Sequence, residues 1–506
     1  MMAFSRMRWL LGFGLLIVPP SWANWKTLGP FGGSAWIVAT DPNLPKTLIA
    51  GTDTGLLFRS QDSGESWSPL PFPARMRATL HTLVIDPRTP GVYFAGLSSD
   101  LPEYSGILRS TDAGASWQQV PALRNRQVRA IAFWRGNSHV LLAGTEIGVF
   151  ESGDGGDSWS SISPAGDSLV LPIVSLAIDP TDSKVIYAGT PHLPWKTTDG
   201  GATWSSIHNG FYDDSDVFSI QVDRNRPQRV FASACSGIYR SLNGGASWTR
   251  LHRALDASDR TYFVTQDPQY ENVWFAGTTH GMMKSNDGGD TWSSIVPLAT
   301  RAISYDLGRL GRIFIATEED GILRSDDWGR TWRGMNRGFC ARYLDALWIG
   351  SDDGRLYVAI NSYPSNRLLR LDNSTDEWEE LPIAARTTEM ALPVTMPVGG
   401  KPFRELQGSR ISLAAQHLSS SDGPPGESIQ AICSYPNNPH WLFAARFGAI
   451  FSSRDGGRSW IRISPSGWPV ISVKQLVVVE GPPDRLFVLS WQQGVYAVTL
   501  DEVLEP

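Results

Sequence analysis

Short apolar segments alternate with polar turns along the whole chain, and this pattern predicts β-strands. The repeat in the middle of the chain is typical: we expect strands over Ile173–Asp179, Val185–Thr190, Trp195–Thr197 and Trp204–Ile207. β-Branched and aromatic residues fill these segments, and Gly, Asp and Pro bound them. No apolar period of 3.6 residues persists for long enough to form an amphipathic helix. The sequence therefore predicts an all-β fold.

An octet of the form Ser/Thr-x-Asp-x-Gly-x-x-Trp follows the third strand of most repeats, and Ser285–Trp292 is one copy. A short Asp side chain can accept hydrogen bonds from nearby backbone N–H groups, and Gly can adopt positive φ. The Trp begins the next strand with a ring that can be buried. Because the Asp recurs in nearly every repeat, we interpret the octet as a structural turn. The Asp positions are Asp62, Asp112, Asp154, Asp199, Asn243, Asp287, Asp327 and Asp455, and the Trp positions are Trp67, Trp117, Trp159, Trp204, Trp248, Trp292, Trp332 and Trp460.

The octets recur at intervals of about 40 to 50 residues, which is the period of propeller blades built from four short strands. A worn ninth copy, Leu371–Trp378, retains its Trp, and three further strands follow over 473–479, 485–489 and 494–500. The fourth strand of that last blade is expected to be the N-terminal segment 24–29, because such pairing closes a ring and removes an exposed edge. The prediction is ten blades. One ring is favoured, and two smaller rings remain an alternative.

The octets resemble the Asp-box (BNR) repeats of sialidases, xyloglucan-hydrolysing double propellers, photosystem II assembly-factor propellers and the ten-bladed sortilin domain. Together with the Ala-Gly-Thr runs before several octets, the resemblance favours the non-enzymatic assembly-factor and sortilin-type propellers. The Phe/Tyr-Arg-Ile-Pro motif that a sialidase needs is absent before the first octet. The chain is also shorter than an enzyme of two seven-bladed rings. Repeat-level resemblance predicts the fold better than the function.

The N-terminus and the composition indicate the compartment. Residues 1–23 combine Arg6 and Arg8 with a short apolar run and a small-residue cleavage site, which is typical of a secretory signal peptide. We therefore expect an exported protein, periplasmic or secreted, whose single propeller domain covers 24–506. A formal charge of −6 disfavours nucleic-acid binding, and no later segment is apolar enough to be a transmembrane helix.

Candidate chemistry is sparse. Cys235, Cys340 and Cys433 could supply one disulfide or three buried thiols. Two octets read Asp-Gly-Gly-Asp, at 154–157 and 287–290, and their spaced carboxylates could hold calcium, although a solvated second Asp is the simpler interpretation. The chain carries no Ser nucleophile elbow, phosphate loop or His-based zinc motif. We predict no cofactor, no metal and no catalytic residue, while a pair of carboxylates acting as in a glycoside hydrolase remains the alternative.

Function is expected at the rim opposite the octets, where the blade-to-blade loops emerge. Arg residues recur at the entrances of the blades, and we predict a ring of Arg suited to a protein or an anionic ligand through forked hydrogen bonds. The other interpretation is that these Arg residues are solvated or paired with loop Asp. The candidate binding residues are Arg77, Arg126, Arg129, Arg260, Arg301, Arg342, Tyr212 and Tyr343.

A Pro-rich insertion at 382–427 interrupts the last repeats. Loops of this length are commonly functional or disordered, and we expect either a partner-docking arm or a floppy insertion on the same face as the Arg residues. The prediction is thus a non-enzymatic propeller that acts as a protein-binding or assembly scaffold. The alternative is an extracytoplasmic glycoside hydrolase or carbohydrate-binding propeller.

Overall fold

The structure is a computed structural model. It describes residues 25–73, 77–163, 171–212, 215–251, 259–350, 355–362, 365–381, 397–398, 401–402, 429–465, 468 and 472–504. The expected signal peptide lies outside the described residues. So does nearly all of the 382–427 insertion, of which the structure describes only β36 (Pro397–Val398) and β37 (Lys401–Pro402).

The described chain contains ten four-stranded antiparallel sheets, which confirms the all-β prediction and the number of blades. Blades 1 to 4 comprise β3 (Ile37–Thr40), β4 (Leu48–Gly51), β5 (Leu57–Ser60), β6 (Ser68–Leu70); β7 (Thr79–Ile85), β8 (Tyr93–Ser98), β9 (Gly106–Ser110), β10 (Gln118–Gln119); β11 (Val128–Trp134), β12 (Asn137–Thr145), β13 (Gly148–Ser152), β14 (Ser160–Ser161); and β15 (Ser175–Ile178), β16 (Ile186–Gly189), β17 (Pro194–Thr197), β18 (Ser205–Ser206).

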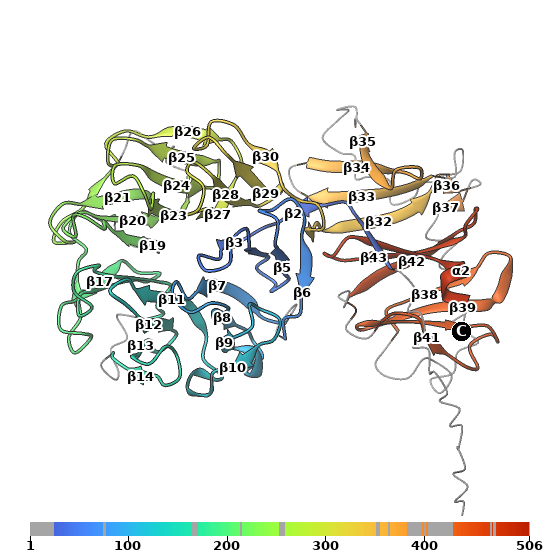
Figure 1. Ribbon diagram of the computed structural model, residues 1–506, viewed down its shortest axis with the longest axis horizontal. Helices are drawn as coiled ribbons and strands as arrows, with labels where there is room; N and C mark the ends of the chain where they lie inside the picture. The colour runs from blue at the N-terminus through green and yellow to red at the C-terminus, as the bar shows by residue number, and fades with distance from the viewer. Residues whose placement is uncertain are drawn as a thin grey trace, which may run out of the picture. The chain divides into compact units, whose positions relative to one another are not determined.

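Blades 5 to 7 continue the same order (Figure 1). They comprise β19 (Val217–Val222), β20 (Val230–Ala234), β21 (Gly237–Ser241), β22 (Thr249–Arg250); β23 (Thr261–Gln266), β24 (Trp274–Thr278), β25 (Met282–Ser285), β26 (Ser293–Val296); and β27 (Thr300–Tyr305), β28 (Ile313–Thr317), β29 (Gly321–Ser325), β30 (Arg333–Gly334).

Three further blades complete the set. They comprise β32 (Leu344–Ile349), β33 (Leu356–Ser362), β34 (Ser365–Asp372), β35 (Glu377–Leu381); β38 (Ala431–Tyr435), β39 (Asn438–Arg446), β40 (Ala449–Ser453), β41 (Ile461–Arg462); and β42 (Val473–Val479), β43 (Arg485–Ser490), β44 (Val495–Thr499) with β1 (Lys26–Gly29). β1 is the outer strand of this tenth blade, beside β44, so the predicted pairing of the N-terminal strand is confirmed.

Helical structure is minor in the described chain. It consists of η1 (Pro102–Tyr104), η2 (Pro121–Leu123) and α2 (Leu500–Leu504). None of these helices is long and apolar enough to cross a membrane.

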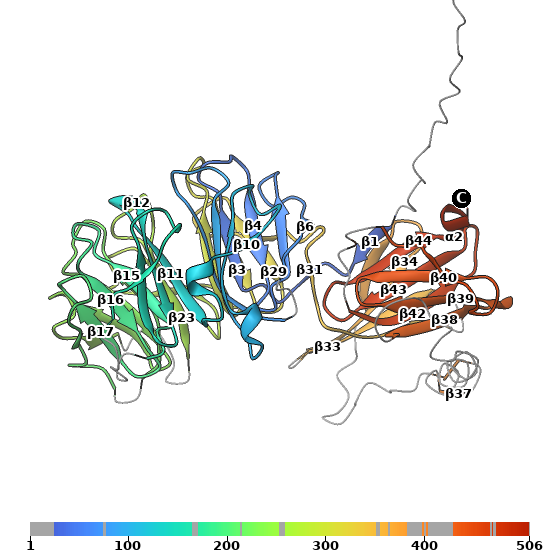
Figure 2. The same cartoon turned by 90° about the horizontal axis from the view of Figure 1, so that it is seen from below.

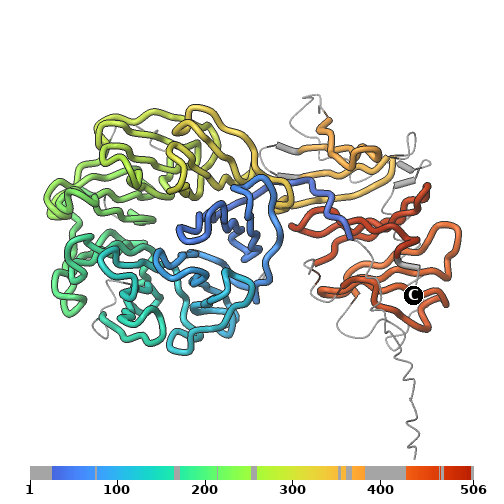
Figure 3. The backbone as a smooth tube through the Cα atoms, in the orientation of Figure 1, coloured from blue at the N-terminus to red at the C-terminus, as the bar shows by residue number. Residues whose placement is uncertain are grey.

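The first seven blades close into a ring by themselves, which corrects the expectation of one ring of ten. Strand β3 of blade 1 lies beside β27 of blade 7. The backbone N–H of Thr40 donates to the Ser304 hydroxyl at 2.8 Å, and the Thr40 hydroxyl donates to the Tyr305 carbonyl at 2.7 Å. Figure 3 shows the chain advancing around this ring from blue to yellow. A seven-bladed ring departs from the ten-bladed sortilin arrangement.

The chain divides into two compact units. One comprises 27–400 with 489–495 and contains the seven-bladed ring, and within it β2 (Gly32–Gly33) pairs in parallel with β31 (Cys340–Ala341) where the chain enters and leaves the ring. The other comprises the described parts of 1–26, 401–488 and 496–506. In that unit β38 packs beside β42, and Figure 2 shows these strands next to one another.

The octets form tight turns with one shared hydrogen-bond pattern. In blade 2, the Ser110 hydroxyl donates to Asp112 at 2.8 Å and accepts from the Gly114 N–H at 2.8 Å. The other Asp112 contacts come from Ser116, whose N–H and hydroxyl donate at 2.8 and 2.6 Å. The Ser116 hydroxyl, followed by its N–H, lowers the pKa of Asp112 to about 2. The carboxylate therefore stays charged and bound to the turn.

The second Gly of the octet also brings neighbouring blades together. Gly156 of blade 3 has φ +91°, and a Cβ there would lie 2.6 Å from the Phe94 ring of blade 2. Gly289 of blade 6 repeats this contact against Phe231 of blade 5 at 2.5 Å. Only Gly satisfies both the backbone angle and the close approach. Each octet is thus a turn within one blade and a packing surface for the preceding blade.

Cationic side chains of the third strands add polar contacts between blades on the octet face. Arg109 of blade 2 pairs with Asp157 of blade 3, and Arg240 of blade 5 pairs with Asp290 of blade 6. Arg324 of blade 7 reaches Glu65 of blade 1 at 3.0 Å, across the ring closure. The second Asp of each Asp-Gly-Gly-Asp octet is therefore an ion-pair partner. Among the described residues, no group of His, Cys, Asp and Glu could hold a metal ion.

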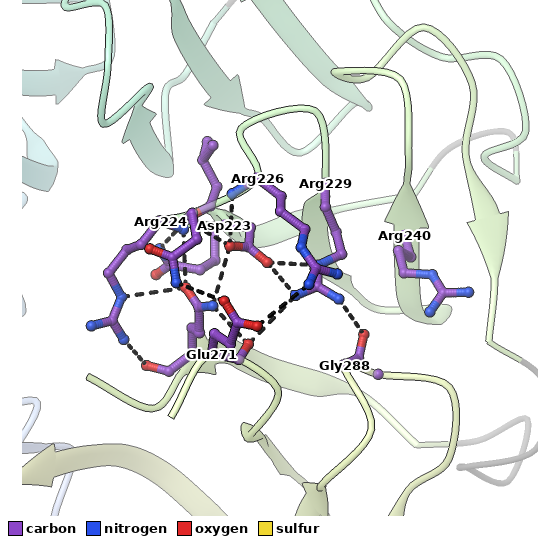
Figure 4. Close-up of polar contacts among 12 residues, drawn as sticks. Asp223, Arg224, Arg226, Arg229, Arg240, Glu271 and Gly288 are labelled. Atoms are coloured by element: carbon purple, nitrogen blue, oxygen red, sulfur yellow. Dashed lines mark hydrogen bonds and ion pairs between the residues drawn. The ribbon is translucent and has the colours of Figure 1, made fainter. Parts of the chain in front are cut away.

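Figure 4 shows a related network between blades 5 and 6. Arg229 is buried against Asp223, which accepts from its Nε at 2.6 Å, and its other nitrogens reach the carbonyls of Glu271 and Gly288 at 3.4 Å. Arg224 donates to backbone carbonyls of the blade 6 turn, including that of Pro268 at 2.6 Å. These charged groups join blades 5 and 6.

Candidate functional site

The inner strands of the ring carry a β-bulge near their first residue, at the end opposite the octets. The bulge falls at the second or third residue of the strand in blades 2, 3, 5, 6 and 7. A bulge leaves one residue unpaired and redirects its side chain. The bulged residues are His81, Arg129, Phe218, Tyr262 and Arg301. Trp36 precedes the inner strand of blade 1 and occupies the corresponding place. We call these six residues the mouth cluster.

Three members of the mouth cluster, from blades 6, 7 and 1, pack on one another. The Arg301 guanidinium lies 3.6 Å from the centroid of the Tyr262 ring and 4.0 Å from that of Trp36. Glu318, on the loop between β28 and β29, accepts from Arg301 at 2.6 Å and from the Tyr262 hydroxyl at 3.0 Å. Burial, with Glu318 nearby, raises the pKa of Tyr262 to about 12. The sandwich therefore fixes one cation between two aromatic faces.

A second part of the mouth cluster comes from blades 2 and 3. The imidazole Nε2 of His81 lies 2.6 Å from the Ser98 hydroxyl. The His81 side chain is exposed, yet neighbouring protein atoms partly desolvate its ring and the nearby Arg129 repels a second positive charge, so the pKa of His81 falls to about 4. Arg129 itself donates to Gln127 at 3.1 Å. His81 is therefore neutral at physiological pH, and Arg129 carries the charge there.

Asp53 is a carboxyl group at the same end of blade 1, on the loop between β4 and β5. Burial raises its pKa, while Arg301 and nearby backbone N–H groups oppose the shift. Its neighbour Thr54 donates to Gln492 at 3.0 Å. Tyr343 is half exposed, and burial together with Asp53 raises the pKa of its hydroxyl. Asp53 is thus a partly buried acid close to the Arg301 sandwich.

The predicted Arg ring is only partly assembled at this mouth. Arg129 and Arg301 are members of the cluster. Arg126 is exposed and lies 3.6 Å from Glu146. Arg260 is exposed beside Asp259, which contacts His280. Arg126 and Arg301 therefore each have a carboxylate partner within the protein, and in both cases the partner is a Glu.

The other predicted residues lie apart from the cluster. Arg77 is exposed and contacts Tyr104, with its guanidinium 5.2 Å from that ring. Tyr212 is half exposed, and its hydroxyl accepts from Arg250 of the outer strand β22 at 3.2 Å.

Arg342 belongs to the β2–β31 connection, where its Nε donates to the Phe31 carbonyl at 3.0 Å. Burial, followed by repulsion from Arg367, lowers its pKa. Arg342 is a partly buried cation that is held within this connection.

The sequence analysis missed Trp36, His81, Phe218, Tyr262, Asp53 and Glu318. A signal was available for the first four, because they occupy the repeat position that Arg129 and Arg301 occupy. The sequence does not show the bulge, and a residue that follows strict alternation would have been assigned to a blade face. The cysteines are free thiols, with Cys340 buried and Cys235 and Cys433 partly buried.

Comparisons with known proteins support the same architecture. The sequence family described as photosynthesis system II assembly factor YCF48 matches residues 109–211. No curated protein matches the chain in sequence.

Solved structures with this architecture include two GH74 proteins. The GH74 xyloglucanase from Xanthomonas campestris is 16% identical with a TM-score of 0.57, over 94% of this chain and 74% of that one. The GH74 enzyme from Niastella koreensis is 16% identical with a TM-score of 0.55, over 95% of this chain and 74% of that one.

A structure of YCF48 bound to D1 peptide also matches, at 17% identity with a TM-score of 0.44, over 61% of this chain and 96% of that one. The chain is a BNR-type β-propeller. At these identities the solved structures indicate the fold and not the activity.

Proposed function

We propose that the protein is an exported, non-enzymatic scaffold that binds a segment of a partner protein at the mouth of its seven-bladed ring. The observation that carries this proposal is the set of bulges, which places one unpaired residue from each of five blades at the same end of the ring. Trp, Tyr and Arg are the residues most enriched at energetic centres of protein interfaces, and all three occur in the cluster.

The charges of the mouth favour a polypeptide of mixed character over a purely anionic ligand. Arg301 is neutralised by Glu318 and stacked between rings, so its remaining surface presents flat, partly apolar area. His81 is neutral, and Asp53 carries a raised pKa. A segment with aromatic or aliphatic side chains and dispersed polar groups fits this surface. The match of 109–211 to an assembly-factor family agrees with a protein partner.

The proposal is tested by pull-down from a periplasmic or secreted fraction, followed by mass spectrometry. We expect Tyr262→Ala and Trp36→Ala to reduce partner capture by tenfold or more, since an interface anchor contributes about 2 kcal/mol or more. Tyr270→Ala is the matched control, because Tyr270 is an aromatic residue on the octet face with 43% of its surface exposed. Unchanged capture by both mouth variants would contradict the proposal.

A carbohydrate-active function is the second candidate, and Asp53 is the observation that favours it. A carboxylic acid with a raised pKa can donate a proton to a leaving group. Tyr343 is close enough to Asp53 for the carboxylate to raise the pKa of its hydroxyl, and Trp36 packs on Arg301 of the same cluster. The test is the release of reducing sugars from a panel of polysaccharides. We expect Asp53→Asn to abolish any such activity, and the second candidate fails if the wild-type protein releases none.

A further inference from the structure

A cavity of about 380 Å³ opens on the octet face, where blade 7 meets blade 1. It lies between two equivalent turns, each joining the first strand of its blade to the second: residues 41–47 of blade 1 and 306–312 of blade 7. Its volume falls within the range of small-molecule sites. The cavity is at the opposite end of the ring from the mouth cluster and is independent of the proposed partner site.

The turn of blade 7 at this seam lacks the donor side chain that other seams have, although the Thr40 hydroxyl of blade 1 donates to the Tyr305 carbonyl beside the cavity. At other seams the turn of one blade donates to a carbonyl of the next: Asn43 to Asp86 at 2.8 Å, and Trp134 to Asp179 at 3.1 Å. Arg224 donates in the same way to the blade 6 turn. Blade 7 has Leu307 and Gly308 at the corresponding turn positions, and neither side chain can donate a hydrogen bond.

The walls of the cavity combine apolar surface with available hydroxyl groups. Pro45, Leu307 and Phe314 supply apolar surface. Thr47 and Ser63 also line the cavity and are only 7% and 6% exposed. Within the part of the chain that the structure describes, neither hydroxyl has a hydrogen-bond partner. Both hydroxyl groups border the cavity and are free to donate to a ligand there or to accept from it.

The charges of the lining leave one cation without a partner. Asp41 accepts from the Asn43 N–H at 2.8 Å and from the Tyr93 hydroxyl at 2.6 Å, so its oxygens are engaged. Asp306 lies 3.6 Å from Arg312. Lys46 has no carboxylate within ion-pair distance among the described residues. Its ammonium group is therefore the available charge at the cavity.

Lys46 also occupies a backbone position that favours glycine. Its φ is +64°, and its carbonyl accepts from the Ser63 N–H at 2.9 Å. In blades 2 and 7 the same position is Gly91 and Gly311, each with φ +77°. A long side chain in this conformation is unfavourable, and such residues concentrate at functional sites. A lysine is thus kept at the cavity where two sister turns use glycine.

We propose that this cavity binds a small organic carboxylate with an apolar body. The carboxylate pairs with Lys46 and accepts from the Thr47 and Ser63 hydroxyls, while the apolar body packs on Pro45, Leu307 and Phe314. A charge-assisted hydrogen bond and the apolar walls together select an amphipathic anion over an inorganic one or a neutral molecule.

The test is calorimetric titration of the full chain with octanoate and benzoate, and with octanol and benzyl alcohol as neutral counterparts. We expect saturable one-to-one binding of a carboxylate that exceeds binding of its alcohol by about tenfold or more. Lys46→Gly is expected to weaken carboxylate binding by about tenfold while leaving the melting temperature unchanged or raised, because glycine suits this φ.

Two further variants complete the experiment. Ser63→Ala is expected to weaken binding about threefold without unfolding, since Ala113 occupies the same octet position in blade 2 with φ +58°. Lys184→Gly is the matched control for Lys46→Gly, because Lys184 occupies the same turn position in blade 4, away from the cavity. This control protein should bind the carboxylate as the wild type does. The proposal is overturned if neither carboxylate binds saturably, if the alcohols bind as tightly, or if Lys46→Gly retains full affinity.

Discussion

The two ends of the seven-bladed ring are built on opposite plans. At the octet end, the same Asp, Gly and Ser groups recur and hydrogen-bond to one another in the same way, as in blade 2 with Asp112 and in blade 6 with Asp287. At the mouth, equivalent positions hold Trp, His, Arg, Phe and Tyr. Repetition follows from a packing requirement that every blade shares. Variation at a fixed position of the repeat indicates a surface that contacts a ligand or a partner instead of a neighbouring blade.

Repeated and variable positions can also be compared within the octet end, between the ring-closing seam and the other seams. Seams between blades are joined by side chains such as Arg229 and Arg324, which contact the next blade's turn. The ring-closing seam keeps its third-strand contact through Arg324 but has Leu307 where other turns place a donor. A local departure from the repeat can therefore indicate a binding site even at the octet end.

The largest effect is expected at the octet end from Trp117→Ala. Trp117 is 9% exposed and packs edge-on against Phe72 with ring centroids 5.2 Å apart. Its removal should lower the free energy of unfolding by roughly 3–5 kcal/mol, measured by urea titration, without changing partner binding. Trp292→Ala is the comparison, because Trp292 is only partly buried and should cost less. Loss of binding without loss of stability would reverse the assigned roles of the two ends.

A smaller effect on stability is expected at the mouth when pH falls and His81 becomes protonated. Its pKa is lowered in the folded state to about 4, below the unfolded value of about 6.5, so the unfolded chain binds more protons between these values. Stability should therefore decrease as pH falls from about 6.5 to 4, by at most about 1 kcal/mol because the ring is solvent-accessible.

His81→Gln should remove this part of the pH dependence. Thermal melts of both proteins at half-unit pH intervals give the comparison, and parallel curves would show that His81 is not desolvated. The two proteins should have similar melting temperatures at pH 7, where both His81 and the substituted Gln are neutral, and this comparison is the control.

The smallest effect is expected from Asp112→Asn at the octet end. The hydrogen bonds from Ser116 hold the folded pKa of Asp112 at about 2, below the unfolded value of about 3.9. Its stabilising contribution is present above pH 4 and is lost as pH falls toward 2. Asn243 already fills this position in blade 5, where its amide donates to Ser247 at 2.9 Å.

The Asp112→Asn protein should therefore fold, lose little stability at pH 7 and show a flatter decline between pH 4 and 2. Circular dichroism during acid titration checks the prediction. A large loss at pH 7 would mean that the carboxylate charge contributes more than its exposed position allows. Together with His81, the two ends of the ring should lose stability in separate pH ranges.

Much of the fold could be predicted from the sequence because it depends on local chemistry. The octet fixes the turn between the third and fourth strands, and alternating apolar residues fix the strands. The strands predicted over 173–207 therefore coincide with β15–β18 to within two residues at every end. The place of β1 in the tenth blade also followed from counting strands, since an unpaired fourth position needs a strand to fill it.

The candidate site was predicted only in part. Arg129 and Arg301 were named for their position at the start of a blade, and both belong to the mouth cluster. Arg342 shares that position in the sequence but is held by the Phe31 carbonyl from a segment about 300 residues away. Whether a charged side chain faces a ligand or a neighbouring carbonyl depends on which distant segment packs against it.

The sequence by itself determined the blade, its turn, the number of blades and the strand that completes the last one. The tertiary structure decided that seven blades close a ring, that a bulge falls at the mouth end of the inner strand in five of them, and that Glu318 neutralises Arg301. Strands and turns follow from interactions within about ten residues, which the sequence displays. Ring closure depends on the small angle between each pair of packed blades, summed over the 264 residues that separate Thr40 from Ser304, and only the packed structure contains that sum.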